Sequence, residues 1–374
     1  MHGYNLKGSV PMCFSNLTSL NMLSLAYNQF SGNISALQTL TLLESLDLSS
    51  NQLYGNISAL ETLTSLQSLD ISNNKFHVLS SLRPLFNLSK LKYLYADNNT
   101  IHADDHEMSH SSAPRFQLSS ISLSCCGSVG SFPQFLYHQS ELQDVTLSGK
   151  YFKVDRFPFW LVENNTELKS LYLVNSSLSG PFQVPSHVHS TLSYLDISNN
   201  AFSGTSHSLQ VLDLSNNQLP GEIPEQMAMG CSSLQSRLEA LDVSRNQLFG
   251  RLPQWRGNAS NLAQVSMADN RLKGSIPRAI CSLNLKLKLL DLSNNSLSRT
   301  LPSCFKPVSV REVHLSRNML QGPLPNAFRD SYSLVTLDIS YNHFKGNIPK
   351  WISNLSELSY LLLKRNHFEG EIPI

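Results

Sequence analysis

The chain has 374 residues, a formal net charge of +1 and only 15% charged residues. An ordinary soluble domain carries about 25% charged residues, so neutral polar side chains must keep this surface hydrated. Because the net charge is close to zero, no overall field attracts a polyanion, and the composition argues against a nucleic-acid partner.

One pattern, L-x-x-L-x-L-x-x-N, recurs along the whole chain, and Leu43–Asn51 is a typical copy. Successive copies are mostly 23 to 25 residues apart. Repeats of this period predict a solenoid in which each copy supplies one coil, here about fifteen coils of ~24 residues. The last positions of the copies are Asn28, Asn51, Asn74, Asn99, Cys126, Lys150, Ser176, Asn200, Asn217, Asn246, Asn270, Asn295, Asn318, Asn342 and Asn366.

Within each copy, the central residues alternate between two faces. Leu46 and Leu48 point one way, whereas Ser45, Asp47 and Ser49 point the other way, as in a half-buried strand. A lone strand cannot bury its leucines, so the strands of neighbouring coils must stack in parallel. We therefore expect an α/β-type solenoid with a parallel β-sheet on its concave face and the x positions exposed there.

The last position of each copy favours asparagine for a physical reason. The chain turns inward there, and an amide that donates and accepts can satisfy backbone groups of adjacent coils. Cys126 and Ser176 are small substitutes, but Lys150 would place an ammonium group in this ladder of buried side chains. The sequence therefore predicts a local irregularity within residues 124–176.

A second motif, L-x-G-x-[IVLF]-P, follows the ladder position in five copies. Its glycine permits a tight backbone, and its proline ends the extended segment. The motif resembles the plant-specific class of leucine-rich repeats, in which this segment forms a second short sheet beside the main one. It occurs at Leu219–Pro224, Leu248–Pro253, Leu272–Pro277, Leu320–Pro325 and Phe344–Pro349.

Several further segments are similar to the receptor-like proteins of plants. This resemblance implies a leucine-rich-repeat ectodomain on the extracellular side of the plasma membrane, carried on a single span and without a kinase. We expect residues 1–374 to form a single solenoid that lacks the family's signal peptide, both caps and the C-terminal span. The segments are Phe116–Leu118, Leu123–Gly127, Phe132–His138, Trp160–Thr166, Leu178–Phe182 and Glu369–Ile374.

The same resemblance implies a ligand-sensing function. The ectodomain would bind a peptide, microbial or cell-wall glycan ligand and signal through a co-receptor kinase in defence or development. Two alternatives remain, namely a secreted leucine-rich-repeat inhibitor of cell-wall-degrading enzymes and the ectodomain of a receptor kinase. The nucleotide-binding, hydrolase and metalloprotease motifs G-x-x-x-x-G-K-[ST], G-x-S-x-G and H-E-x-x-H do not occur, so we predict no enzyme activity.

The spacing of the repeats is irregular near residues 200–240. Asn217 lies only 17 residues after Asn200, and Asn246 follows 29 residues later. Seventeen residues barely close a coil, although the two steps together equal two repeats of 23 residues. We interpret the region as an irregular join produced by a deletion or a mis-joined exon.

Ten acceptor sites for N-linked glycans match N-x-[ST] and favour a secreted or cell-surface fate. None falls at an exposed x position within an L-x-L strand, so glycans would leave the concave sheet open to a partner. The alternative is that N-L-[ST]-x-L belongs to the repeat consensus and that the sites are copies of one another. The sites are Asn16, Asn33, Asn56, Asn87, Asn98, Asn164, Asn175, Asn258, Asn294 and Asn354.

The concave x positions are the default binding face, because a rigid scaffold presents them over a long surface. Most carry Ser or Asp, which we interpret as solvated filler, whereas aromatic and Arg side chains dominate desolvated hot spots. We hypothesise that these outliers contact a ligand; the alternative is ordinary surface variation. They are Tyr93, Tyr95, Asp97, Tyr172, Glu312, His314, Arg317, Tyr360, Leu362, Lys364 and Arg365.

Two other clusters are interpreted as structural. His102, His106 and His110 have the spacing of a helical metal site, but they fit a polar loop better, and we predict no metal or cofactor. The six cysteines are too few and too dispersed for a disulfide scaffold. Adjacent Cys125 and Cys126 are interpreted as strand-end residues, because a disulfide between neighbours is strained.

Overall fold

In the computed structural model, the chain forms two compact units. The first comprises Met1–Ser179 and Pro185–Leu192, and the second comprises Gly180–Val184 and Ser193–Ile374. The structure describes residues 5–79, 81–102, 113–124, 127–130, 132–152, 156–182, 191–203, 211–223, 238–254, 261–283 and 285–372.

In the first unit, each L-x-L core forms a three-residue strand of a parallel sheet. Neighbouring strands are in step, so that Leu23, Leu46 and Leu69 are direct partners. This main sheet follows from the period-two pattern, because only stacking lets each coil bury its leucines. Its strands are β2 (Met22–Ser24), β4 (Ser45–Asp47), β6 (Ser68–Asp70), β8 (Tyr93–Tyr95), β10 (Ser120–Ser122), β12 (Asp144–Thr146) and β14 (Ser170–Tyr172).

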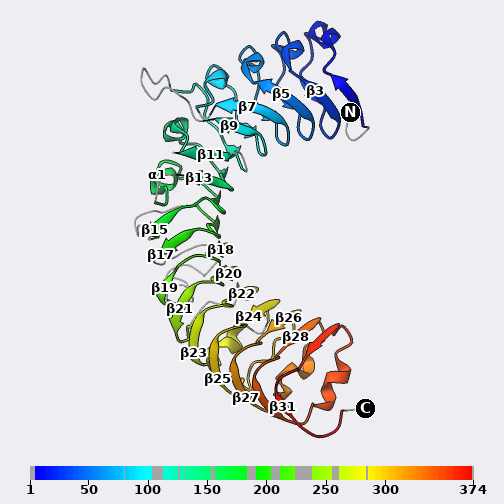
Figure 1. The fold of residues 1–374 in the computed structure, drawn as a ribbon, viewed down its shortest axis with the longest axis vertical. Coiled ribbons are helices and arrows are strands. Elements are labelled where there is room, and N and C mark those ends of the chain that lie inside the picture. Colours follow the sequence, from blue (N-terminus) through cyan, green and yellow to red (C-terminus); the bar gives the residue numbers. More distant parts are fainter. Residues whose placement is uncertain are drawn as a thin grey trace. The chain divides into compact units, whose positions relative to one another are not determined.

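A second set of short parallel strands follows the ladder positions of the first unit, and Figure 1 shows these strands lying side by side. The second set of strands expected from the resemblance to plant-type repeats is therefore confirmed, and it also occurs in coils that lack the full motif. One sheet contains β1 (Lys7–Ser9), β3 (Gln29–Gly32), β5 (Gln52–Asn56), β7 (Lys75–Leu79) and β9 (Thr100–His102), and a separate two-stranded sheet contains β11 (Gly127–Gly130) and β13 (Lys150–Phe152).

The second unit repeats both sheets. Its main parallel sheet contains β16 (Tyr194–Asp196), β18 (Val211–Asp213), β20 (Ala240–Asp242), β22 (Gln264–Ser266), β24 (Leu289–Asp291), β26 (Glu312–His314), β28 (Thr336–Asp338) and β30 (Tyr360–Leu362). Its second sheet contains β19 (Pro220–Glu222), β21 (Gln247–Gly250), β23 (Arg271–Ser275), β25 (Ser296–Arg299), β27 (Met319–Gly322), β29 (His343–Gly346) and β31 (His367–Phe368). Two further strands are β15 (Ser179–Pro181) and β17 (Ala201–Ser203).

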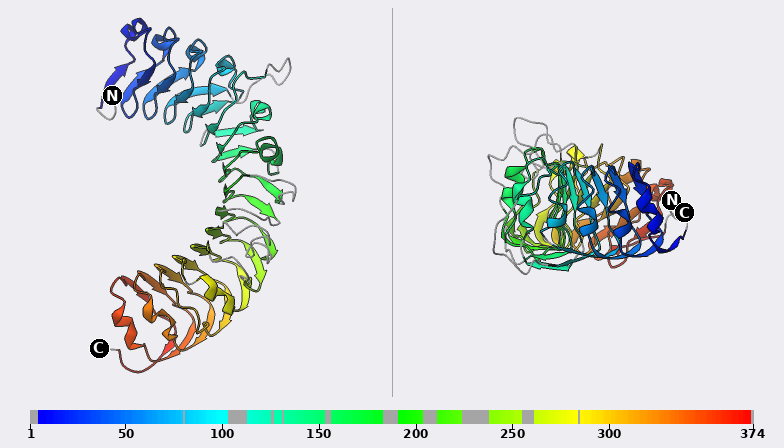
Figure 2. Two further views of the ribbon diagram at one scale, coloured as in Figure 1. Left: turned by 180° about the vertical axis from the view of Figure 1, so that it is seen from behind. Right: turned by 90° about the horizontal axis from the view of Figure 1, so that it is seen from above.

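Short helical turns return the chain to the next strand, and Figure 2 shows them gathered along one side of each unit. Most are 3-10 turns closed by bonds such as Leu37 N–H to the Ile34 carbonyl, 2.9 Å. They are η1 (Met12–Asn16), η2 (Ser35–Leu37), η3 (Ser58–Leu60), η4 (Arg83–Leu85), η5 (Gln134–His138) and α1 (Phe159–Asn164) in the first unit, and η7 (Arg278–Leu283), η8 (Asn326–Asp330) and η9 (Lys350–Asn354) in the second.

The predicted ladder of buried asparagines is confirmed. The Asn51 side-chain amide donates to the carbonyl of Leu25 in the preceding coil at 2.9 Å and to the carbonyls of Leu48 and Ser49 at 3.1 Å. Its oxygen accepts the Phe30 N–H at 2.9 Å. The Asn51 side chain therefore satisfies backbone groups of two adjacent coils.

The irregularity predicted within residues 124–176 lies in the two-stranded sheet of β11 and β13. The pairing of β11 with β13 shifts register between Ser128 and Gly130, whereas β10, β12 and β14 remain in step. At the ladder position Ser176, the hydroxyl donates to the Leu147 carbonyl at 3.1 Å and so replaces one amide bond. Cys126 and the Lys150 side chain lie outside the described part.

The main-sheet strands around the 17-residue repeat keep the regular register. Tyr194 pairs with Val211, and Val211 pairs with Ala240. The Asn217 amide donates to the Ile197 carbonyl at 3.0 Å, so the ladder continues across the 17-residue coil. The segments that would carry the irregular join, residues 204–210 and 224–237, lie outside the described residues, and the join stays a prediction.

The residue before each ladder position adopts a left-handed conformation that the sequence did not reveal. Its φ lies between 50° and 58° at each non-glycine example described, including Tyr27, Arg317, Tyr341 and Arg365. This turn ends each strand of the main sheet and directs the next residue inward. For an L-residue it costs roughly 1–2 kcal/mol, and only Gly, Asn and Asp adopt it readily.

Candidate functional site

The register of the second unit brings two predicted ligand clusters together. Glu312 and Tyr360 occupy the same row of the main sheet, separated by one residue of β28, Thr336. His314 and Leu362 occupy the next row, where they flank Asp338. Residues that lie about 48 positions apart in the sequence are therefore two strands apart, about 10 Å.

The left-handed positions of three successive coils complete this cluster with Arg317, Tyr341 and Arg365. The Arg317 guanidinium lies 4.9 Å from the centroid of the Tyr341 ring, and the Lys364 ammonium lies 5.4 Å from it. Both distances suit cation–π attraction. Two cations therefore hold one tyrosine that is still 38% exposed.

Tyr341 was missed in the sequence analysis. It occupies the same position of its repeat as Arg317 and Arg365, directly before ladder residue Asn342. Comparison of that single column across the repeats would have found it. We call Glu312, His314, Arg317, Tyr341, Tyr360, Lys364 and Arg365 the C-terminal cluster.

Inside and beside the C-terminal cluster, the acidic side chains have basic or polar partners. His314 Nε2 lies 3.3 Å from a Glu312 carboxylate oxygen, and both side chains are partly exposed. The Asp338 carboxylate accepts the backbone N–H of Ser340 at 3.0 Å and its hydroxyl at 2.7 Å. Asp338 and Glu312 carry two negative charges against the three positive charges of Arg317, Lys364 and Arg365, so a small excess of positive charge remains at the strand ends.

The predicted cluster of the first unit is more structural. The Tyr95 hydroxyl lies 3.3 Å from the Ser120 hydroxyl oxygen, and the Asp97 carboxylate accepts the Ser122 hydroxyl at 2.7 Å and the Ser124 N–H. Tyr93, by contrast, is an exposed ring on the same strand. Tyr172 lies in β14, three strands from β8, so it is separated from this group by about 14 Å.

A row of aspartates runs along the main sheet of the second unit. Asp196, Asp213 and Asp242 are direct partners in adjacent strands. The pKa of Asp213 is raised to about 6, mainly by burial and to a smaller extent by the two flanking carboxylates, while hydrogen bonds from Ser215 oppose the rise. Asp213 is thus half-buried and coupled to its neighbours, and its interpretation as solvated filler was wrong.

The acceptor asparagines that the structure describes are all exposed. Asn16, Asn164 and Asn354 lie in helical turns of the return segments, and Asn87 follows another such turn. Asn33 and Asn56 lie at the second sheet, while Asn98, Asn175 and Asn294 occupy left-handed strand-end positions. Asn258 lies outside the described residues. The described sites leave the strands of the main sheets uncovered.

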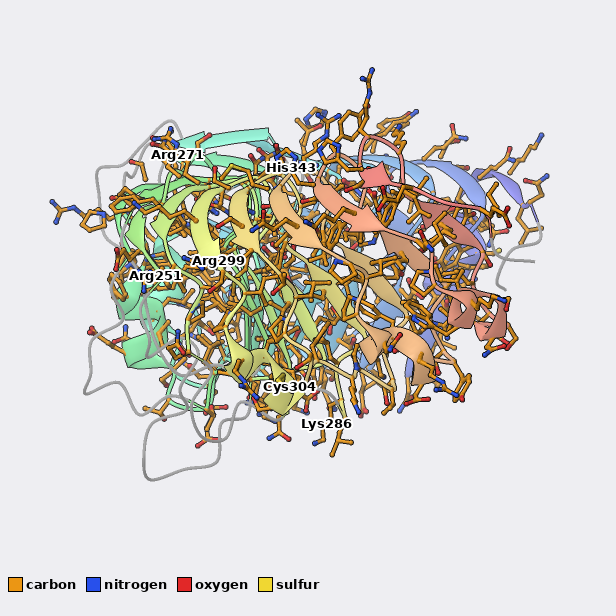
Figure 3. The ribbon with its side chains drawn as sticks, turned by 90° about the horizontal axis from the view of Figure 1, so that it is seen from below. Arg251, Arg271, Lys286, Arg299, Cys304 and His343 are labelled. Atoms are coloured by element: carbon orange, nitrogen blue, oxygen red, sulfur yellow. A yellow bond between two sulfur atoms is a disulfide. The ribbon has the colours of Figure 1, made fainter. Side chains whose placement is uncertain are left out.

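A disulfide joins Cys281 to Cys304 in the second unit, with a Cα–Cα distance of 5.7 Å. The sequence analysis missed this pair. The two cysteines are 23 residues apart, one repeat, and therefore have the same phase in successive coils. Figure 3 shows Cys304 near Lys286, on the opposite rim from Arg271 and His343. Cys125 and Cys126 lie outside the described part.

The described residues contain no group of three or more His, Cys, Asp or Glu side chains placed to hold a metal ion. The side chain of His102, together with His106 and His110, lies outside that part of the chain. Among the helices that are described, none is long and apolar enough to cross a bilayer.

Comparison with known sequences identifies the repeats. Residues 308–368 match the family described as leucine rich repeat, and residues 65–88, 208–228 and 286–307 match a second leucine-rich-repeat family. The chain is 32% identical over 339 residues to Cuscuta receptor 1 of Solanum lycopersicum, an alignment covering 90% of the chain and 26% of that protein. It is 35% identical over 191 residues to Receptor-like protein 13 of Arabidopsis thaliana, covering 42% of the chain and 17% of the relative.

Solved structures give the same fold. A TDR receptor matches with a TM-score of 0.82 and 26% identity over 97% of this chain and 63% of that one. The Arabidopsis receptor kinase HAESA, solved with the peptide hormone IDA and the co-receptor SERK1, matches with a TM-score of 0.76 and 30% identity over 100% of this chain and 62% of that one. The chain thus spans about a quarter or less of the two curated relatives and less than two thirds of these receptor ectodomains.

Proposed function

Because the chain belongs to the leucine-rich-repeat receptor-like proteins of plants, we propose that it is a ligand-sensing segment of a cell-surface receptor. The segment binds a peptide, microbial or cell-wall ligand outside the plasma membrane and signals through a partner kinase. It acts by recognition and carries out no catalysis.

The left-handed strand-end positions of the C-terminal cluster carry this proposal. Most described coils place Asn, Ser, Gly or Asp there, and Tyr27 and Arg245 are isolated exceptions. Three successive coils, in contrast, place Arg317, Tyr341 and Arg365 there. Large side chains are costly in this conformation, and departures from local preference concentrate at functional sites. Exposed tyrosine and arginine are also the residues that dominate binding hot spots.

A peptide is the ligand class that this cluster suits best. Tyr341 and Tyr360 offer aromatic surface, while Arg317, Lys364 and Arg365 offer hydrogen-bond donors to main-chain carbonyls or acidic side chains. The structural relative HAESA is complexed with a peptide hormone and the co-receptor SERK1, which supports a peptide ligand and a partner kinase here.

The test uses the chain secreted from a eukaryotic host and a library of short peptides displayed on phage. Wild-type protein should enrich peptides that are lost when Tyr341 and Arg317 are each changed to Asn, a residue that suits the left-handed turn. Tyr27→Asn, at the same repeat position in the first unit, is the matched control and should retain them. Equal enrichment by wild type and by the Tyr341→Asn and Arg317→Asn variants would refute the proposed site.

A further inference from the structure

An aromatic stack on the return side of the first unit is not used by the proposed ligand site. The rings of Tyr137, in η5, and Trp160, in α1, are stacked with centroids 3.9 Å apart and an interplanar angle of 23°. Phe132 meets Trp160 edge-on at 6.1 Å and stacks on Phe152 at 4.1 Å. The inner side of the stack is thus fixed by buried phenylalanines, while Tyr137 is 50% exposed.

The glycan acceptor Asn164 lies beside this stack. It ends α1, four residues after Trp160, and residues with this spacing are neighbours on a helix surface. Helical side chains also lean toward the N-terminus, so a group on Asn164 covers the turn that contains Trp160. These two rules place a group attached to the exposed Asn164 side chain over the turn that carries Trp160.

The next residue shows that the two adjacent asparagines have different roles. Asn165 is fully buried, accepts the Leu142 N–H at 2.9 Å and donates to the Leu161 carbonyl at 2.9 Å. These bonds fix the end of α1 against the preceding coil. Asn164, which begins the sequence Asn-Asn-Thr, is left facing solvent on a rigid base.

We propose that the first sugar of an N-linked glycan on Asn164 packs against the Tyr137–Trp160 stack. The Asn164 amide nitrogen bonds to C1 of N-acetylglucosamine and loses one proton, while the lipid diphosphate that carried the oligosaccharide leaves with the C1 oxygen. One face of a pyranose ring presents only C–H groups, which suit the negative face of an aromatic ring. The platform thereby shields exposed aromatic surface and fixes the direction of the glycan.

Other acceptors of the same repeat phase provide natural comparisons. Asn87 and Asn354 also lie in or just after helical turns of the return segments, but the residues four positions earlier are Arg83 and Lys350. Trp351, adjacent to Lys350, is buried and therefore not open to a sugar. Only the Asn164 glycan should show contact with an aromatic ring among these three sites.

The test uses the whole chain secreted with a heterologous signal sequence from cells that attach N-glycans. An endoglycosidase that leaves one N-acetylglucosamine per site is compared with an amidase that removes it, and Tyr137→Phe and Tyr137→Ser are compared with wild type. We expect the acetyl methyl signal of the sugar on Asn164 to show a nuclear Overhauser effect to an indole ring. Its chemical shift should move upfield, and both signals should weaken in Tyr137→Ser but persist in Tyr137→Phe.

Thermal unfolding provides the second measurement. Removing the last sugar should lower the Tm of wild type more than that of Tyr137→Ser, by an additional ~1–2 °C, and Asn164→Gln should abolish the difference. A glycosylated Asn164 without ring contact, or an equal loss in both proteins, overturns the inference. This inference rests on the proposed extracellular function. Absence of glycans from Asn87 and Asn354 as well would count against that function, whereas absence of ring contact at Asn164 alone would not.

Discussion

The Arg317 guanidinium lies 4.9 Å from the centre of the Tyr341 ring, although the two residues are separated by one whole coil. Both residues occupy left-handed positions with φ of 54°. The contact arises because every strand of the main sheet ends in the same turn. The side chain at that turn therefore lies directly beside the equivalent side chain of the next coil. We propose that this column of strand-end residues forms part of the ligand-binding surface together with the exposed positions of the strands.

Replacing Tyr341 by Asn should separate binding from stability. Asparagine favours the left-handed turn and offsets the loss of a cation–π contact worth about 0.5–1 kcal/mol at an exposed site. We therefore expect the free energy of unfolding to change by less than ~1 kcal/mol in urea denaturation, while peptide binding is lost. A variant that both unfolds more easily and still binds would contradict the assignment of Tyr341 to the binding surface.

Replacing the ladder residue Asn318 by Leu should be strongly destabilising. Its amide donates to the Leu292 carbonyl at 2.9 Å, and its oxygen accepts the Leu297 N–H at 2.9 Å. Each backbone group left buried without a partner costs about 1–3 kcal/mol, so we expect a loss of ~2–5 kcal/mol in urea denaturation. The exposed residue Gln321 of β27 provides the control, and Gln321→Ala should change stability by less than ~0.5 kcal/mol.

Stability should depend on pH through Asp213. Its pKa is raised from 3.8 to about 6 in the folded protein, so the folded state binds the proton more tightly than the unfolded state. The ionised carboxylate therefore opposes folding above pH 6, and its effect fades as the pH falls from about 7 to 4. The Tm of Asp213→Asn should exceed that of wild type at pH 7.5, with the gap closing at pH 4. A difference in Tm between the two proteins that does not change with pH would show that the pKa of Asp213 is not raised.

The disulfide between Cys281 and Cys304 should stabilise the second unit. It closes a loop of 23 residues, for which chain entropy predicts about 3 kcal/mol. Treatment with a thiol reductant should lower the Tm of wild type and leave that of the Cys281→Ala/Cys304→Ala double variant unchanged. Identical responses of the two proteins would show that the bond does not form in solution.

The sequence predicted the main sheet and the ladder because both depend on local periodicity. Leu46 and Leu48 can be buried only if neighbouring coils stack, and Asn51 is the side chain that can satisfy two coils at once. It also placed the described acceptor asparagines outside the strands of the main sheet. The sequence named most members of the C-terminal cluster as candidate ligand residues. It missed Tyr341, because the repeat pattern assigns no role to the residue that precedes each ladder position.

Repeat period by itself determined the class of fold, the burial of the leucines between stacked coils and the main parallel sheet, since these follow from one coil repeated. The second set of strands was expected from the resemblance to plant-type repeats. Only the tertiary structure decided which side chains of different coils touch, as for Arg317 with Tyr341, Cys281 with Cys304 and Tyr137 with Trp160. Such contacts depend on the backbone conformation at each turn and on the path of each return segment. Neither is encoded in the spacing of leucines, because residues of equal phase meet only when their coils superimpose in three dimensions.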